Sequence, residues 1–329
     1  MIRPSRLRHM GTILGLIAGV ALGALLLRHF GVDPVLRLLK RRMGGIALVI
    51  LFHGVQIGLT AAAWQAVSRC LSAGPSFGTF ILLRWLREGI NSLLPVAQIG
   101  GPVLAIRLLC RHGQNSGMAM AGAIVDTSVE LVTQIVSTLL AVGILAGIKG
   151  TDVLAPALVG IVVVSGLTAA FIAAQSLGGA RMAELAATRL GWRGAGNGLH
   201  DGIVAIYRRR RALGSASVFH LLAWLSGSVE VAMTFHFFGR DIGLGPALVI
   251  DSLGQAIRTA SFAVPAALGV QEGGYILVCG LLGFSPDLAL ALSLTKRLRE
   301  VVFGIPSIGL WQWLEARAPD ESKDDEANP

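Results

Sequence analysis

The chain has 329 residues, of which 53% are hydrophobic and 14% are charged, and its mean hydropathy is +0.68. A soluble domain carries about 25% charged residues, so this composition excludes an ordinary water-soluble enzyme. It also excludes a disordered chain, which would be poor in apolar residues. We therefore predict an all-α, polytopic helical membrane protein. Because the bases that give the net charge of +9 flank apolar segments, they indicate contact with anionic lipid and not with nucleic acid.

Six segments are apolar and long enough to cross a hydrocarbon core of about 30 Å, which takes about 20 helical residues. They are residues 11–30, 43–66, 117–148, 153–175, 214–238 and 288–314. The arginines before residue 11 resemble those of a signal peptide, but no small-residue cleavage site closes the apolar run that follows them. We therefore expect a retained first span.

Two further apolar regions, 77–110 and 246–283, are interrupted by proline and glycine. The interrupting residues are Pro95, Gly100 and Gly101 in the first region and Pro265, Gly269, Gly273 and Gly274 in the second. Irregular backbone at membrane depth is tolerated only where protein or a wet cavity covers it. We therefore predict two re-entrant helical hairpins. The alternative in each region is an ordinary pair of kinked crossings.

A basic segment divides the predicted membrane domain, residues 1–316, into two halves. The halves are 43–148 and 213–316, the linker is 177–213, and an acidic tail follows at 317–329. Basic loops stay in the cytoplasm, which places the linker and both termini there. The linker also contains an amphipathic stretch at 199–207, which we expect to form a surface helix. The basic loop 37–42 then falls outside, against the rule, so either the first span does not cross or this loop lies along the outer interface.

The two broken regions can be aligned with each other. When Pro95 is aligned with Pro265, Glu130 aligns with Glu300, and the order of span, broken hairpin and charged span occurs twice. In the topology above, the first hairpin enters from the cytoplasm and the second from outside. Inverted repeats whose broken helices meet near the midplane are a recurrent transporter plan, and we hypothesise such a repeat here.

Ionisable residues within the apolar segments are candidates for a site, because each costs about 2.5–3.5 kcal/mol on insertion scales. Asp126 and Glu130 are four residues apart and share a helix face. In the last predicted helix, Lys296 and Arg297 lie within one turn of Glu300, so this helix can neutralise itself locally. For each residue the alternative is a buried ion pair that locks helix packing.

Arginines inside an apolar hairpin suit a phosphate or another anionic head group, so we predict a polar slot for the head group of a lipid. Residues expected to line the slot are Arg84, Arg87, Glu88, Asn91, Arg258, Gln271 and Glu272, and those expected on the cavity wall or in a proton relay are Asp126, Glu130, Arg297 and Glu300. Glu272, beside two glycines at a chain break, is the strongest candidate. Its alternative role is that of an acid opposing the dipole at a helix N-terminus. We expect His53, His220 and His236 to be packing or interface residues.

Enzyme chemistry has little support in the sequence. No HExxH, GxSxG or P-loop motif occurs, and Cys70, Cys110 and Cys279 are not spaced for a metal or a disulfide framework. We expect no catalytic residue, metal or cofactor. Two alternatives to a transporter stay open: a membrane-embedded enzyme that modifies a lipid head group, and a non-catalytic scaffold for lipid-synthesis enzymes.

Three stretches together carry a resemblance. The first runs from Arg84 to Pro95 and is followed by Gly100 and Gly101, the second is Gly-Val-Gln-Glu-Gly-Gly at 269–274, and the third is Lys-Arg-Leu-Arg-Glu at 296–300. They resemble the lysylphosphatidylglycerol synthase transmembrane-region family, also called the flippase-like domain family. Within it the sequence looks most like the hopanoid-biosynthesis-associated membrane protein branch (HpnL-like). The resemblance covers residues 10–314.

This resemblance implies a bacterial inner-membrane protein that flips or presents a lipid. The branch implies a hopanoid or a related polyisoprenoid or anionic lipid as cargo, and hopanoid-synthesis enzymes as partners. Some members carry a soluble aminoacyl-transferase domain. The segment 315–329, which follows Leu314, is too short for one, so the resemblance does not imply synthase activity here.

Overall fold

A computed structural model of the chain describes residues 42–71, 74–93, 100–150, 198–261, 264 and 267–316, with scattered residues between 162 and 173. Helices form all of the regular secondary structure in this part of the chain. The predicted span 11–30, most of the span 153–175, the linker before residue 198 and the tail 317–329 lie outside the described residues. Pro95 and Pro265 lie outside them too.

Eight of the described helices form two sets with the same order and similar lengths. The first set is α3 (Met43–Ser68), α4 (Phe77–Leu93), α5 (Gly100–Arg111) and α6 (Ser116–Lys149), and the second is α10 (Arg210–Phe237), α11 (Leu244–Ala260), α12 (Val270–Leu281) and α13 (Pro286–Ala316). Helices α4 and α11 have 17 residues each, and α5 and α12 have 12 each. Residues at the same place in matching helices of the two sets are called counterparts below.

The long helices agree with the predicted spans. Within the described residues, α3, α6 and α10 are long and apolar enough to cross a membrane. They contain the predicted spans 43–66 and 117–148 and nearly all of 214–238. The span predicted at 288–314 lies within α13, whose apolar character is interrupted by four charged residues between 296 and 300. Each broken region forms two helices, one on either side of its interruption.

Local signals place the ends of α6. The Asn115 side chain accepts hydrogen bonds from the backbone N–H groups of Gly117 (2.9 Å) and Met118 (3.3 Å), which satisfies two donors that a helix start leaves open. The helix ends at Gly150, whose φ of +89° suits glycine.

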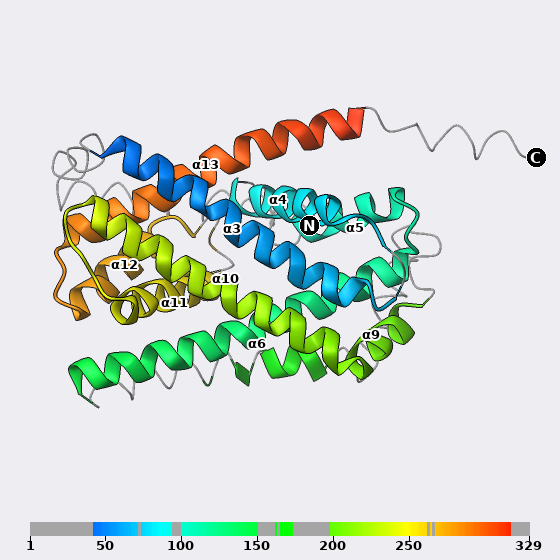
Figure 1. The fold of residues 1–329 in the computed structure, drawn as a ribbon, viewed down its shortest axis with the longest axis horizontal. Helices are drawn as coiled ribbons and strands as arrows, with labels where there is room; N and C mark the ends of the chain where they lie inside the picture. Colours follow the sequence, from blue (N-terminus) through cyan, green and yellow to red (C-terminus); the bar gives the residue numbers. More distant parts are fainter. Residues whose placement is uncertain are drawn as a thin grey trace, which may run out of the picture.

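Helices α3 and α10 run antiparallel through the centre of the molecule (Figure 1). Gly45 at the start of α3 faces Phe237 at the end of α10. Near the middle, Gln56 Nε2 donates to the carbonyl of Ala223 at 3.3 Å. Around this pair, α4 packs on α13 and its counterpart α11 packs on α6. Each broken region is therefore held by the long last helix of the other set.

Small residues allow these cross-set contacts to be close. A Cβ added at Gly89 of α4 would lie 2.9 Å from Ser307 Cβ and 3.0 Å from Gly304 Cα of α13, the kind of close backbone approach that glycine permits between membrane helices. On the other side, the hydroxyl oxygens of Ser137 in α6 and Ser252 in α11 lie 2.7 Å apart.

Helix α9 (Leu199–Arg208) confirms that the stretch predicted at 199–207 is helical. Its residues Leu199, Ile203 and Ile206 are buried in a core that they share with the first set, and α9 packs on α6. Its apolar side therefore covers protein, while the four arginines at 208–211 are exposed.

Candidate functional site

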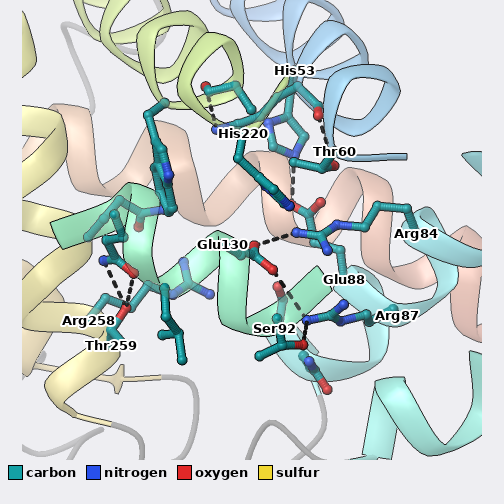
Figure 2. Close-up of a pocket in the computed structure, with 18 of the residues that line it drawn as sticks. His53, Thr60, Arg84, Arg87, Glu88, Ser92, Glu130, His220, Arg258 and Thr259 are labelled. Carbon is teal, nitrogen blue, oxygen red and sulfur yellow. Dashed lines mark hydrogen bonds and ion pairs between the residues drawn. The ribbon is translucent and has the colours of Figure 1, made fainter. Parts of the chain in front are cut away.

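A cavity of about 390 Å³ lies between the two sets of helices (Figure 2). Its walls come mainly from α3, α4, α6, α10 and α11. Of the residues predicted for the site, those that line this cavity are Arg84, Arg87, Glu88, Asn91, Glu130 and Arg258. The first hairpin thus supplies most of the predicted polar lining.

The cavity is bordered by counterparts from both sets. His53 and His220 are each the eleventh residue of their helix, in α3 and α10, and Ser92 and Thr259 are each the sixteenth, in α4 and α11. Ser92 and Thr259 both line the cavity and are labelled in Figure 2. The last turns of α4 and α11, next to the two chain breaks, therefore meet at one site.

A first charged cluster joins α4 to α6. Arg84 and Arg87 both pair with Asp126 and Glu130: Arg84 Nη1 lies 3.4 Å from Asp126 Oδ2, and Arg87 Nη2 lies 3.4 Å from Glu130 Oε2. His220 Nε2 lies 3.0 Å from Asp126 Oδ1. The shared helix face of the two acids thus meets the two arginines of the first hairpin, and Figure 2 shows this contact for Glu130.

A second cluster passes through His53. Its Nε2 lies 2.7 Å from Glu88 Oε1, and its Nδ1 lies 3.4 Å from Glu230 Oε2 without forming a hydrogen bond. Arg299 Nη1 donates to both Glu230 oxygens, at 2.5 and 2.8 Å. His53 is therefore a link between the first hairpin and the helices of the second set, beyond the packing role expected for it.

The second cluster continues from Glu230 to α11. Lys296 Nζ lies 3.9 Å from Glu230 Oε1 and 2.8 Å from Asp251 Oδ1. Lys296 therefore pairs with another helix, whereas Arg297 makes the local pair expected in the last helix, with Nη1 3.2 Å from Glu300 Oε2. Helix α13 thus forms ion pairs both within itself and with a neighbouring helix.

A third cluster holds the second hairpin to α13. Arg258 pairs with Glu300, and its Nη1 also donates to Gln271 Oε1 at 3.3 Å. Arg297 Nε lies 3.1 Å from Glu272 Oε1. Four residues predicted for the slot or its wall, Gln271, Glu272, Arg297 and Glu300, thus lie behind the cavity, and Arg258 connects them to it.

The Glu272 carboxylate caps helix α12. Its Oε2 accepts a hydrogen bond from the backbone N–H of Gly269 at 2.7 Å, and its Oε1 accepts one from Ser293 Oγ at 3.3 Å. Gly269 has a φ of +74°, a conformation that favours glycine. Glu272 therefore occupies the helix-start position given above as its alternative, and it also binds Arg297.

Glycines lie close to both breaks. Gly100 begins α5, and the backbone N–H of Gly101 donates to Asn91 Oδ1 at 3.0 Å. In the second hairpin, a Cβ added at Gly274 would lie 3.0 Å from Ile257, whereas one at Gly273 would meet nothing within 4 Å. Gly101 and Gly274 thus allow the two helices of each hairpin to approach closely.

Sequence reasoning missed Glu230, Asp251 and Arg299 as members of the buried network. Their partners lie on other helices, 45 residues away for Asp251 and 69 for Glu230 and Arg299. No local spacing marks such pairs. His236, by contrast, is exposed and pairs with Asp241 at 2.6 Å.

The arrangement provides buried guanidinium groups around a polar cavity. Guanidinium groups bind phosphate and carboxylate oxygens through paired N–H donors, so an anionic group could bind here by exchanging with the carboxylates that the arginines now contact. Within the described part of the chain, no three His, Cys, Asp or Glu side chains lie together in a way that would hold a metal ion.

A comparison with protein families supports the prediction of a membrane protein. The family described as lysylphosphatidylglycerol synthase TM region matches residues 12–307, a range that contains both hairpins and all three charged clusters. No curated protein and no solved structure matches the chain. The chain belongs to the lysylphosphatidylglycerol synthase transmembrane-region family, and it is a membrane protein of lipid biology.

Proposed function

We propose that the protein moves a membrane lipid between leaflets by passing its polar head group through the cavity, while the apolar part stays in the bilayer. The observation that carries this proposal is the cavity itself, bordered by the ends of α4 and α11 and lined by Arg84, Arg87, Arg258 and Arg299. Its volume of about 390 Å³ suits a small polar group.

The helix lengths support a transporter built from inverted repeats. Helices α3 and α10 are antiparallel, so matching crossings would have opposite directions in the membrane. Helices α5 and α12 have 12 residues each, which extend about 18 Å at 1.5 Å per residue, short of the roughly 30 Å core. We infer that both hairpins turn back within the membrane, as the broken helices of many secondary transporters do.

The cargo that we propose is a hopanoid or a related polyisoprenoid or anionic lipid, in the bacterial inner membrane. Family membership supports a lipid, and the arginines of the cavity support an anionic head group. The exposed arginines at 208–211 favour a cytoplasmic position for the end of the linker, and with it cytoplasmic termini.

Fluorescent phosphatidylglycerol and a labelled hopanoid in sealed vesicles test this function. A reductant that cannot cross the bilayer destroys the label in the outer leaflet, so loss of inner-leaflet label reports lipid movement. Wild-type protein should speed this loss over protein-free vesicles, and Arg87→Gln should slow it about tenfold or more, because a hydrogen bond to a charged group contributes about 1.5–3 kcal/mol.

The control is Arg211→Gln, which changes an exposed arginine and should behave like wild type. Thermal unfolding must show that both variants are folded. Folded wild-type protein that moves neither lipid would contradict the proposal. Chemical change of a head group in detergent would instead favour the membrane-embedded enzyme.

A further inference from the structure

The charges of the ion-pair network in the two helix sets balance only when one histidine carries a proton. In the second set, Arg258, Lys296, Arg297 and Arg299 are matched by Glu230, Asp251, Glu272 and Glu300, whereas in the first set Arg84 and Arg87 are matched by three acids, Glu88, Asp126 and Glu130. Burying an unbalanced charge is costly. The acid left over is Glu88, and it pairs with His53.

His53 lies between a carboxylate that faces the cavity and one that is buried. The Glu88 side chain is 33% exposed and lines the cavity, whereas the Glu230 side chain is 2% exposed. The imidazole presents Nε2 to Glu88 at 2.7 Å and Nδ1 toward Glu230 at 3.4 Å. An imidazole that takes a proton on one nitrogen and gives one up from the other can connect two such groups.

The neighbouring helices fix the charges around this imidazole. Helix α4 presents Glu88, α10 presents Glu230, and α13 presents Arg299 together with the Phe303 ring, whose centroid lies 5.3 Å from that of the imidazole. Helix α6 adds Glu130 to the cavity wall, where the arginines of α4 pair with it. Because Arg299 binds both Glu230 oxygens, Glu230 keeps its negative charge in this conformation.

The second set cannot form an equivalent pair. The counterpart of His53 is His220. The counterpart of Glu88, the twelfth residue of α4, is Gln255, the twelfth residue of α11. His220 contacts Asp126, whose charge the two arginines of α4 already balance. Among the buried histidines of the described helices, the combination with an otherwise unbalanced carboxylate thus occurs once, on the cavity wall.

We propose that lipid movement through the cavity is coupled to proton movement and that His53 and Glu88 form the pair that binds the proton. The proposal rests on the proposed function above. A proton from the cavity binds the Glu88 carboxylate and passes to His53 Nε2, which leaves an imidazolium beside the Glu88 carboxylate. The proton on Nδ1 then passes to the Glu230 carboxylate when Arg299 releases that group. One proton moves in each step, and no electron is transferred.

The test uses the same sealed vesicles, with labelled phosphatidylglycerol in the membrane, a pH-sensitive dye inside and the membrane potential clamped at zero. If one proton moves with each lipid, a gradient of one pH unit sustains about a tenfold difference in labelled lipid between leaflets, because one pH unit corresponds to a factor of ten in a one-proton equilibrium. His53→Gln should abolish this difference. His236→Gln, which changes the exposed histidine, should keep it.

The double variant His53→Gln/Glu88→Gln separates proton binding from a structural role. His53→Gln alone leaves Glu88 unbalanced and should lower the Tm, whereas the double variant removes both charges and should recover a Tm near that of wild type. The double variant should still show no difference driven by the pH gradient. It therefore also serves as the test if the single variant does not fold.

The outcomes distinguish the two proposals. A pH-driven lipid difference in the folded double variant would overturn the assignment of the proton to His53 and Glu88. Lipid equilibration by wild type that ignores the pH gradient would overturn the coupling but leave the proposed function standing. Absence of any lipid movement by folded wild type would overturn the proposed function itself.

Discussion

Arg84 and Asp251 occupy the same place, the eighth residue, in α4 and α11, yet they carry opposite charges. Their partners are also counterparts and are also exchanged: Asp126 Oδ2 lies 3.4 Å from Arg84 Nη1, and Lys296 Nζ lies 2.8 Å from Asp251 Oδ1. Both sets thus keep an ion pair between the first hairpin helix and the long last helix, with its polarity reversed. The fold therefore keeps an ion pair at this position, whichever of the two helices carries the positive charge.

Removing one member of such a pair should destabilise the protein. Asp251→Asn leaves Lys296 with Glu230 as its remaining carboxylate, 3.9 Å away, and breaking a buried pair costs about 3–5 kcal/mol. Thermal unfolding in detergent should therefore show a clear fall in Tm. Asp251→Asn/Lys296→Met removes both charges and should restore most of the lost Tm. An Asp251→Asn protein as stable as wild type would mean that this pair contributes nothing.

Glu272→Gln should loosen the start of α12. The change removes the negative charge that binds Arg297 and weakens the bond to the Gly269 N–H, and a hydrogen bond to a charged group contributes about 1.5–3 kcal/mol. Hydrogen exchange should become faster in the first turn of α12, and the Tm should fall. If lipid movement stopped while both quantities stayed at their wild-type values, Glu272 would instead act on the cargo directly.

Gly89→Ala should push α4 away from α13. The added Cβ would lie 3.0 Å from the backbone of Gly304, and overpacking of this kind costs about 1–3 kcal/mol. The matched control is Gly147→Ala in α6, where an added Cβ meets nothing within 4 Å and alanine favours the helix by about 0.5–1 kcal/mol. Thermal unfolding should therefore rank Gly147→Ala at or above wild type and Gly89→Ala below both.

Cysteines at Ser137 and Ser252 should form a disulfide between α6 and α11. The two hydroxyl oxygens lie 2.7 Å apart, and the free Cys70, Cys110 and Cys279 would first be replaced by alanine. A membrane-permeable oxidant should give a crosslink visible after proteolysis between the two helices. Because the disulfide ties the first set to the second, it should stop lipid movement. Adding a reductant should restore lipid movement. Undiminished movement in fully crosslinked protein would show that these helices need not separate.

The helices could be predicted because their signals are local. An apolar run of fixed length predicts a span, and proline with glycine predicts a break, so the predicted spans at 43–66 and 117–148 lie within α3 and α6. The shared face of Asp126 and Glu130 also follows from helix geometry alone. Their partners do not, since Arg84 lies 42 residues from Asp126 and 46 from Glu130.

The similarity between the two sets of helices was only partly visible in the sequence, for a geometrical reason. The break between α11 and α12, from Ser261 to Gly269, is longer than the break between α4 and α5, which covers positions 94–99. The helices before the break and those after it therefore align at different offsets. The single offset that aligns Glu130 with Glu300 does not align His53 with His220. Aligning each side of the break separately would have found the two histidines.

The distribution of ion pairs has a consequence for how the chain enters the membrane. Each arginine and lysine of the buried network finds a carboxylate within its own set of helices, and the ion pairs between the sets run from His53 to Glu230 and from His220 to Asp126. The N-terminal half can therefore leave the insertion machinery with its charges already neutralised, before the second half has been synthesised. The ion pairs that form when the two halves dock would then involve imidazoles, whose charge is the cheapest in the network to remove.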